Sequence, residues 1–324
     1  MTSRYLGRRL LQAIITIAGI VLLNFVLFRM MPGSPERVLM RNPNMTQAAM
    51  AAQRARWGLD EPLFPNPLVA YVSSTLQGDL GASFKYRGQP VTEVIGGRVG
   101  PTLVLFGLGE LIAIFVGLIL GAYSGWRRGG PVDYVGNGVS LILYSMPYFL
   151  LGMILLVIFA TSLGWFPTTG MQTLGANFAS PLEQALDFLR HLILPLAAVS
   201  LGLIGQYSIL MRSSVIETRA EDYIQTARAK GLRGSRILRA HAVPNALLPT
   251  VSLIGINLGF IVAGAITVEV VFNWPGLGTL TQEALAARDY PVLQGVFLIL
   301  AICVVLANLL ADIVYGFLDP RVRT

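Results

Sequence analysis

Six long apolar stretches divide this chain and restrict what it can fold into. Each has close to the roughly 20 residues that a helix needs to cross a bilayer. Charged residues make up only 13% of the sequence, against about 25% in an average soluble domain. We therefore expect an all-α integral membrane protein with six transmembrane helices. The stretches are approximately 10–31, 102–123, 135–163, 192–210, 247–271 and 292–315.

Arginine and lysine gather at alternate ends of these stretches: before the first, after the second, between the fourth and fifth, and after the sixth. With six spans all four groups fall on one side, which the positive-inside rule makes the cytoplasm, together with both termini. The net charge of +7 follows from these groups and does not indicate nucleic-acid binding, because no aromatic-basic stripe suited to base stacking accompanies it.

This orientation divides the chain into regions. Residues 1–31 would form a tail and the first helix, which is too long for a signal-peptide core and has no cleavage site. Residues 32–98 would be an extracytoplasmic cap segment, in which Asn44 can begin a helix over 45–57 and Gly78 and Gly81 mark turns. Residues 99–318 would form the membrane core, and residues 319–324 a cytoplasmic tail.

A polar, basic island, residues 221–249, separates the fourth and fifth stretches within a cytoplasmic segment expected at 212–246. Tyr223, Ile224 and Ala227 share a stripe at helical spacing, and Gly231 is expected to end that helix, as a glycine at C′ does. A second short helix would run from Gly234 or Ser235 to Pro244. A plain solvated loop is the alternative, but such a loop needs neither an apolar stripe nor a glycine hinge.

We call residues 221–249, with their two expected short helices, the elbow. Its sequence resembles the EAA loop of permease subunits of bacterial ABC importers. That pattern is Glu-Ala-Ala, three residues, Gly, nine residues, then Ile-x-Leu-Pro. The chain keeps Ala227, Gly231 and Pro244 at these spacings and departs from the pattern at Gln225, Thr226, His241 and Val243. The dipeptide/oligopeptide/nickel branch of this family resembles the chain more closely still. The resemblance lies in the segment Asp-Tyr-Ile-x-Thr-Ala-Arg-Ala-Lys-Gly-Leu and in shorter segments such as Gly164-Trp-Phe-Pro and Arg288-Asp-Tyr-Pro.

The resemblance implies a type I ABC importer permease fold in a bacterial inner membrane. It also implies three kinds of partner: a second, related permease in a heterodimer, two ATPase subunits that bind the ATP and Mg, and an extracytoplasmic substrate-binding protein. Short peptides are the expected cargo, although relatives with similar strings carry nickel complexes, glutathione or haem.

In the family the elbow docks into a groove on the ATPase. An apolar ridge of Tyr223, Ala227, Gly231 and Leu232 would enter that groove. The cationic side chains of Arg228, Lys230 and Arg233 would meet acidic residues at its rim. The elbow residues carried over from the resemblance are Tyr223, Gln225, Thr226, Ala227, Arg228, Lys230, Gly231, Leu232 and Pro244.

Two further places are candidates for the transport path. Glu110 lies inside the second stretch, where a carboxylate is costly and should face a cavity or a partner; the alternative is a structural hydrogen bond to a neighbouring helix. Pro147 should kink the third span beside Phe149, near a gate. A turn with aromatic anchors is expected at the outer face, at Phe272, Trp274, Pro275, Gly276 and Gly278.

Catalytic motifs are missing from the sequence. A P-loop needs Gly-Lys, but the two lysines follow Phe84 and Ala229. Two histidines and one cysteine cannot build a His/Cys metal cluster. We therefore expect a transport subunit that is not an enzyme and binds no cofactor or metal. A secondary transporter is the less favoured alternative, since it would want several midplane carboxylates and inverted repeats.

Overall fold

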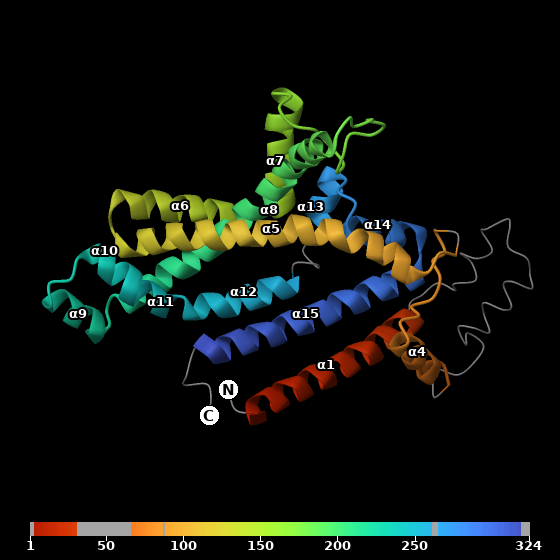
Figure 1. The fold of residues 1–324 in the computed structure, drawn as a ribbon, viewed down its shortest axis with the longest axis horizontal. Helices are drawn as coiled ribbons and strands as arrows, with labels where there is room; N and C mark the ends of the chain where they lie inside the picture. Colours follow the sequence, from red (N-terminus) through yellow and green to blue (C-terminus); the bar gives the residue numbers. More distant parts are fainter. Residues whose placement is uncertain (1–2, 31–65, 87, 261–264, 319–324) are drawn as a thin grey trace, which may run out of the picture.

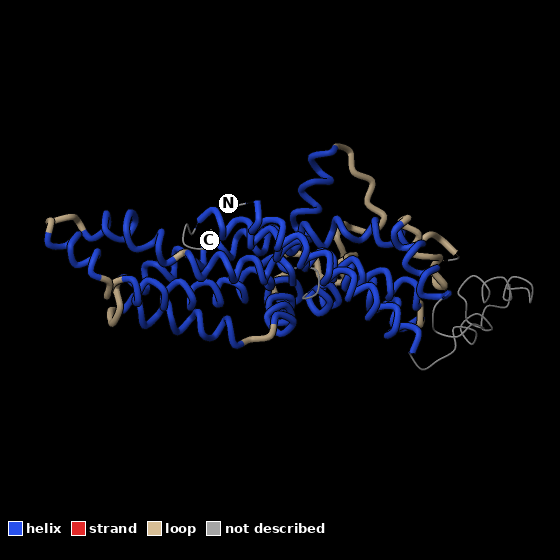
Figure 2. Tube along the Cα trace, turned by 90° about the horizontal axis from the view of Figure 1, so that it is seen from below, coloured by secondary structure: helices blue, strands red, loops and turns tan. Residues whose placement is uncertain are grey.

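The computed structural model describes residues 3–30, 66–86, 88–260 and 265–318 (Figures 1 and 2). Within these ranges the chain is helical apart from the connections, the longest of which is 163–180, and one isolated bridge between Ala82 and Pro90. The helices are α1 Ser3–Met30, α4 Asn66–Leu76, α5 Val91–Trp126, α6 Pro131–Ser145, α7 Tyr148–Leu155, the π-helix η1 Leu156–Ser162, α8 Pro181–Thr218, α9 Asp222–Ala229, α10 Gly234–Ile237, the π-helix η2 Leu238–Ala242, α11 Val243–Ala246, α12 Leu248–Phe260, α13 Ala265–Phe272, α14 Leu277–Ala287 and α15 Tyr290–Leu318.

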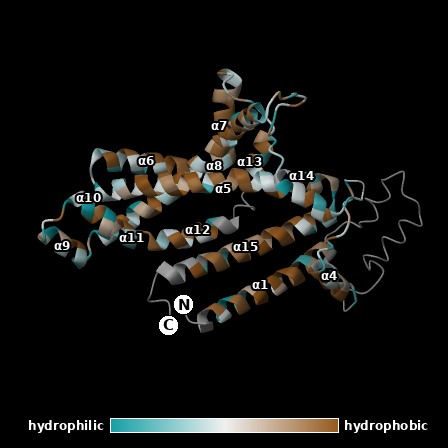
Figure 3. Ribbon diagram, viewed as in Figure 1, coloured by the Kyte–Doolittle hydropathy of each residue, from teal (hydrophilic) through white to brown (hydrophobic). Residues whose placement is uncertain are grey.

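The apolar stretches of the sequence form the long helices. Four described helices, α1, α5, α8 and α15, are long and apolar enough to cross a membrane. Two bent pairs, α6 with α7–η1 and α10–α11 with α12, raise the number to as many as six if each pair is one span. Apolar residues dominate α1, α5 and α15, and polar residues gather on α9 and α10 (Figure 3). The expected number of six spans stays a prediction.

The helices form two rows (Figure 1). In one row α8 packs along α5 and also against α6, and in the other α15 packs against both α12 and α1. The α5–α8 contact is close because glycines on α5 face α8. A Cβ atom at Gly117 would lie 2.6 Å from the Cβ of Tyr207, and one at Gly125 would lie 2.6 Å from the carbonyl oxygen of Arg212. These small residues let the two helices approach in lipid.

Among the described residues, the helix ends beside the basic groups point toward one end of the molecule (Figure 1). The start of α1, the end of α5, the end of α15 and helices α9 and α10 all lie toward the left in Figure 1; we call this the elbow end. There Arg9 and Asp312 form an ion pair of 3.0 Å between α1 and α15. Helices α4 and α14 lie at the opposite end, which we call the far end.

At the far end, residues 79–86 form a strap that is fixed to α14 and α15. The Ser83 hydroxyl and the Lys85 backbone N–H both donate hydrogen bonds to the buried carboxylate of Asp289. Lys85 and the Tyr86 hydroxyl contact the carboxylate of Glu283. The expected turns are confirmed, with Gly78 at φ 78° and Gly81 at φ 86°.

One boundary differs from the expected one. Helix α5 begins at Val91, well before the apolar stretch, so the limit expected between residues 98 and 99 falls inside a helix. The reason is that Val91 and Ile95 are buried against α14 and α15, which extends the helix beyond the part that hydropathy marks. The helix expected over 45–57 lies outside the described residues.

Candidate functional site

The first arm of the elbow ends as its sequence predicts. After α9, Gly231 has φ +75°, a conformation that glycine adopts without strain. The N–H of Leu232 donates to the carbonyl of Ala227, and the N–H of Gly231 donates to the carbonyl of Arg228. This pair of bonds is the Schellman motif, and the side chain of Leu232 packs into the same apolar cluster as Ala227, as that motif commonly requires.

The second arm begins at Gly234 as expected, but it does not end at Pro244. The chain passes through the π-helix η2 and continues as α11 to Ala246, and only then bends by 50° into α12. Proline lacks an N–H and crowds the carbonyl four residues before it. The π-helix η2, whose wider turns place acceptors five residues back, lies directly before Pro244, and the chain continues past the proline as α11.

The apolar stripe of α9 faces this chain's own core. Ile224 is completely buried and Ala227 is 6% exposed, and both pack in a cluster with Met211 and Val215 of α8. This burial corrects the expectation that Ala227 belongs to a ridge entering a partner's groove. Tyr223 is 41% exposed, and the outward face of α9 also carries Gln225, Thr226 and Lys230.

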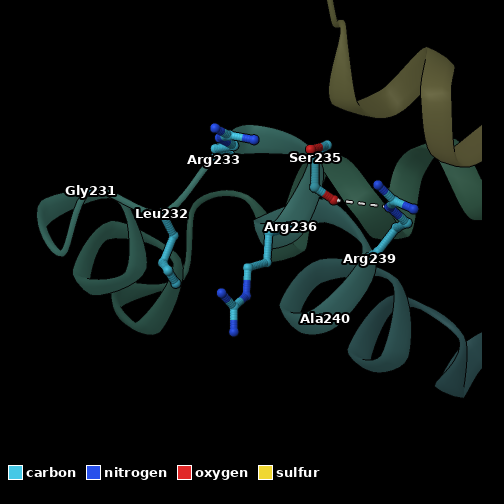
Figure 4. Close-up of a pocket in the computed structure, with 7 residues that line it drawn as sticks. All are labelled: Gly231, Leu232, Arg233, Ser235, Arg236, Arg239 and Ala240. Carbon is cyan, nitrogen blue, oxygen red and sulfur yellow. Dashed lines mark hydrogen bonds between the residues drawn. The ribbon is translucent and has the colours of Figure 1, made fainter.

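Between the two arms lies an open hollow of about 660 Å³. Its lining is basic, and Figure 4 shows the side chain of Arg236 reaching into the space between the two arms while Leu232 points inward below Gly231. The lining residues are Gly231, Leu232, Arg233, Ser235, Arg236, Arg239 and Ala240. The hollow can receive an acidic group with an apolar edge. Arg228 is not among these residues, because its guanidinium lies over the ring of Trp126.

Glu110 joins three helices. Its carboxylate is 2% exposed and accepts a hydrogen bond from the Tyr207 hydroxyl of α8, which in turn accepts one from Asn257 of α12 at 3.0 Å. Asn257 also donates to Gln206 at 3.2 Å. The structure therefore supports the helix-to-helix role for Glu110, whose second oxygen has no partner among the described residues. Tyr207 and Asn257 were not found from sequence, because polar residues inside apolar stretches do not reveal their partners.

Pro147 breaks the third span rather than kinking it. Helix α6 ends at Ser145 and α7 begins at Tyr148, with an angle of 102° between the two parts. Phe149, in the first turn of α7, is 42% exposed. A role for either residue in a gate stays a prediction.

The turn expected at the outer face is a buried joint. Phe272 is 2% exposed and Trp274 is completely buried, with its indole N–H bonded to the carbonyl of Pro101 at 3.0 Å. The expectation of surface anchors is therefore wrong for these two rings. The sequence did not reveal Glu269, which organises the joint: its carboxylate accepts hydrogen bonds from the Thr102 hydroxyl and from the N–H groups of Gly278 and Thr279. It thereby caps the start of α14, as carboxylates do at helix N-termini.

Pro275, Gly276 and Gly278 have structural places in the same joint. Pro275 lies in the connection between α13 and α14. A side chain at Gly276 would collide with the carboxylate of Glu269, and Gly278 supplies one of the bonded N–H groups. The joint holds α13 and α14 against α5.

Comparison with solved structures identifies the class of fold. A chain of the MetNI methionine ABC transporter, in an inward-facing conformation, superposes with a TM-score of 0.58 over 71% of this chain and 99% of that chain, at 17% identity. The fold is that of a type I ABC permease. The family of binding-protein-dependent transport system inner membrane components matches residues 113–324, and this chain belongs to that family.

Relatives that match along nearly the whole chain are named as peptide-transport proteins. A Brucella suis protein named as a peptide permease is 41% identical over 99% of both chains. The oligopeptide transport system permease protein AppB of Bacillus subtilis is 36% identical, also over 99% of both chains. The dipeptide transport system permease protein DppB of Escherichia coli is 37% identical over 99% of this chain and 98% of its own. The expectation of a permease subunit is confirmed.

Proposed function

We propose that this chain is one of two related permease subunits of an importer for short peptides, driven by separate ATPase subunits and supplied by an extracytoplasmic binding protein. The observation that carries the peptide assignment is identity of 36–41% with peptide permeases along nearly the whole chain. Nickel complexes, glutathione and haem remain the alternative cargoes. The ATP and Mg belong to the ATPases, and this chain contributes the path and not the catalysis.

The elbow is the docking surface for the ATPase, on the cytoplasmic side together with both termini. Two features support this assignment: Tyr223 is exposed on the outward, mostly polar face of α9, and an arginine-lined hollow is present in the elbow. An aromatic ring next to a basic hollow suits a partner surface that offers an apolar pocket and a carboxylate at its edge.

The cargo is tested by uptake in cells that lack this chain and in cells that receive it back. Labelled dipeptides, longer peptides, glutathione, haem and nickel chelates are supplied separately. We expect the chain to restore accumulation of peptides. Restored accumulation of nickel or haem with no gain for any peptide would overturn the peptide assignment while leaving the permease assignment intact.

The docking surface is tested by co-purification of the ATPase. We expect Tyr223→Glu to reduce the amount of ATPase that is recovered with the chain, because it places a charge where an apolar contact is proposed. Tyr134→Glu is the matched control, since Tyr134 is 75% exposed on α6 at the same end and is not part of the elbow. Equal recovery for both variants would remove Tyr223 from the interface.

A further inference from the structure

Four segments of the elbow end meet at the indole of Trp126, the last residue of α5. The guanidinium of Arg219, which follows α8, lies 5.4 Å from the ring centroid, and that of Arg228, in the last turn of α9, lies 5.8 Å from it. A Cβ atom at Gly234, the first residue of α10, would lie 3.8 Å from the indole. One side chain therefore contacts both arms of the elbow and the end of α8.

Trp126 itself belongs to a rigid part of the membrane core. The preceding residue, Gly125, approaches α8 so closely that no side chain fits there. The guanidinium of Arg219 also donates to the carbonyl of Gly125 at 3.0 Å. Nearby, Arg212 of α8 forms a two-bond ion pair with Asp133 of α6, at 2.5 and 3.0 Å. Helices α5, α6 and α8 are thus tied together where they meet the elbow.

The two guanidinium groups are an unfavourable pair in themselves. Burial, and then the positive charges of Arg228 and Arg128, lower the pKa of Arg219. In the part of the chain that the structure describes, no carboxylate forms an ion pair with Arg219 or Arg228. The electron-rich faces of the indole supply the attraction that holds both cations at this point.

We propose that Trp126 is the positioning residue through which movement of the elbow reaches α5. Without the indole, α9 would be connected to the membrane core at this corner by the chain at Ala220 and by apolar packing, and could turn about that connection. With the indole, Arg219 and Arg228 hold α9 at a fixed angle to α5, so a displacement of the elbow moves the α5–α8 pair with it. This inference rests on the proposed function, in which the ATPase displaces the elbow.

The first test separates the aromatic ring from simple packing. Trp126→Leu keeps an apolar side chain and removes the π face, whereas Trp126→Phe keeps a π face. The purified transporter, with its ATPase and binding protein, is placed in liposomes, and the peptide imported per ATP hydrolysed is measured. We expect the ratio to fall about three- to tenfold in Trp126→Leu, to stay near the wild-type value in Trp126→Phe, and the ATPase to remain bound in both.

Trp165→Leu is the matched control, because Trp165 is 63% exposed, lies after η1 and forms a tilted ring contact with Phe159 away from the elbow. A wild-type ratio in Trp126→Leu, or an equal fall in the Phe and Leu variants, would overturn the proposal. So would loss of the bound ATPase in Trp126→Leu, since that result would give Trp126 only a structural role in folding the elbow.

A second readout does not depend on transport, so a failure of the peptide assignment cannot be confused with a failure of this proposal. Spin labels are placed at Val135 of α6 and Ser235 of α10, both exposed, in a Cys303→Ala background. We expect a narrow distance distribution in the unaltered joint and in Trp126→Phe, and a broad one in Trp126→Leu. Equal widths in all three would show that the indole does not set the angle of the elbow.

Discussion

At the scale of single residues, Gly231 shows how one backbone conformation can serve two purposes. Its positive φ ends α9, and a Cβ atom added there would meet nothing within 4 Å in this chain. A substitution at Gly231 therefore costs backbone strain, about 1–2 kcal/mol for a side chain in the left-handed region. It also adds bulk on the surface that we assign to the ATPase.

These two effects can be separated. Asparagine tolerates the left-handed conformation better than alanine does, while it is the larger side chain. If the backbone conformation is what coupling requires, peptide import should be lower in Gly231→Ala than in Gly231→Asn. If close approach of the ATPase is what matters, Gly231→Asn should be the worse variant. Import and ATPase binding measured together decide this, and wild-type import in both variants would contradict a role for Gly231.

Glu269 is the second residue whose role can be measured. Its carboxylate accepts hydrogen bonds from Thr102, Gly278 and Thr279 at a completely buried position. Glu269→Gln puts an N–H₂ group among these donors, so we expect a loss of about 1–3 kcal/mol of stability and a lower melting temperature in detergent. Glu93→Gln, at an exposed position in the first turn of α5, should melt like the wild type.

At the scale of elements, the contact between α5 and α8 depends on a stripe of glycines along α5. Gly117, Gly121 and Gly125 repeat at intervals of one helical turn and face atoms of α8. Gly107 lies on α5 as well, but a side chain there would meet nothing within 4 Å. The same helix thus provides both a test position and its control.

We expect Gly121→Leu to separate α5 from α8. A Cβ atom at Gly121 would lie 2.8 Å from the Cβ of Met211, and overpacking of this kind costs about 1–3 kcal/mol or more. The yield of monodisperse protein and its melting temperature in detergent should both fall, whereas Gly107→Leu should leave them near wild type. Equal behaviour of the two variants would contradict the close packing at Gly121.

The attachment of the strap, residues 79–86, should depend on pH through Glu283. Burial raises the pKa of Glu283, but contacts with Lys85 and Tyr86 and the charge of Arg98 outweigh it, so its pKa lies below the ordinary 4.5. A carboxylate with a lowered pKa contributes stability that is present above its ordinary pKa and is lost as pH falls through the lowered value.

A spin label at Gln89, an exposed position just after the strap, would report this attachment. We expect an immobile spectrum at neutral pH and a mobile one well below pH 4.5. Glu283→Gln should be mobile throughout, because it removes the charge that Lys85 contacts. A wild-type spectrum that does not change with pH would show that Asp289 alone holds the strap.

At the scale of the whole molecule, the structure brings the basic ends of the apolar stretches together at the elbow end, as the sequence predicts. The side of the membrane on which this end lies is a separate prediction. With Cys303 replaced by alanine, Ser235→Cys should react with an impermeant thiol reagent only from the cytoplasm, and Gln282→Cys on α14 only from outside. Both positions are exposed. Labelling of both from the same side would contradict the orientation.

The sequence by itself determined features that depend on the local chain. Apolar length located the membrane helices because lipid leaves no other partner for backbone N–H and C=O groups. Gly231 marked the end of α9, and Pro147 marked where the third span is disturbed, because both act through backbone geometry. The sequence predicted a kink at Pro147, whereas the structure has a break. The resemblance of residues 225–244 to the EAA loop indicated the family.

Only the tertiary structure decided which faces are used, because burial depends on partners far away in the chain. It turned Ile224 and Ala227 inward and left Tyr223 outside. It buried Trp274 against Pro101, and it gave Glu269 a partner at Thr102. Trp126 lies beyond the apolar stretch 102–123 and had no role assigned from the sequence, whereas in the folded chain it meets Arg219 and Arg228. No regular spacing in the sequence marks these pairs of residues, because packing between distant parts of the chain brings them together.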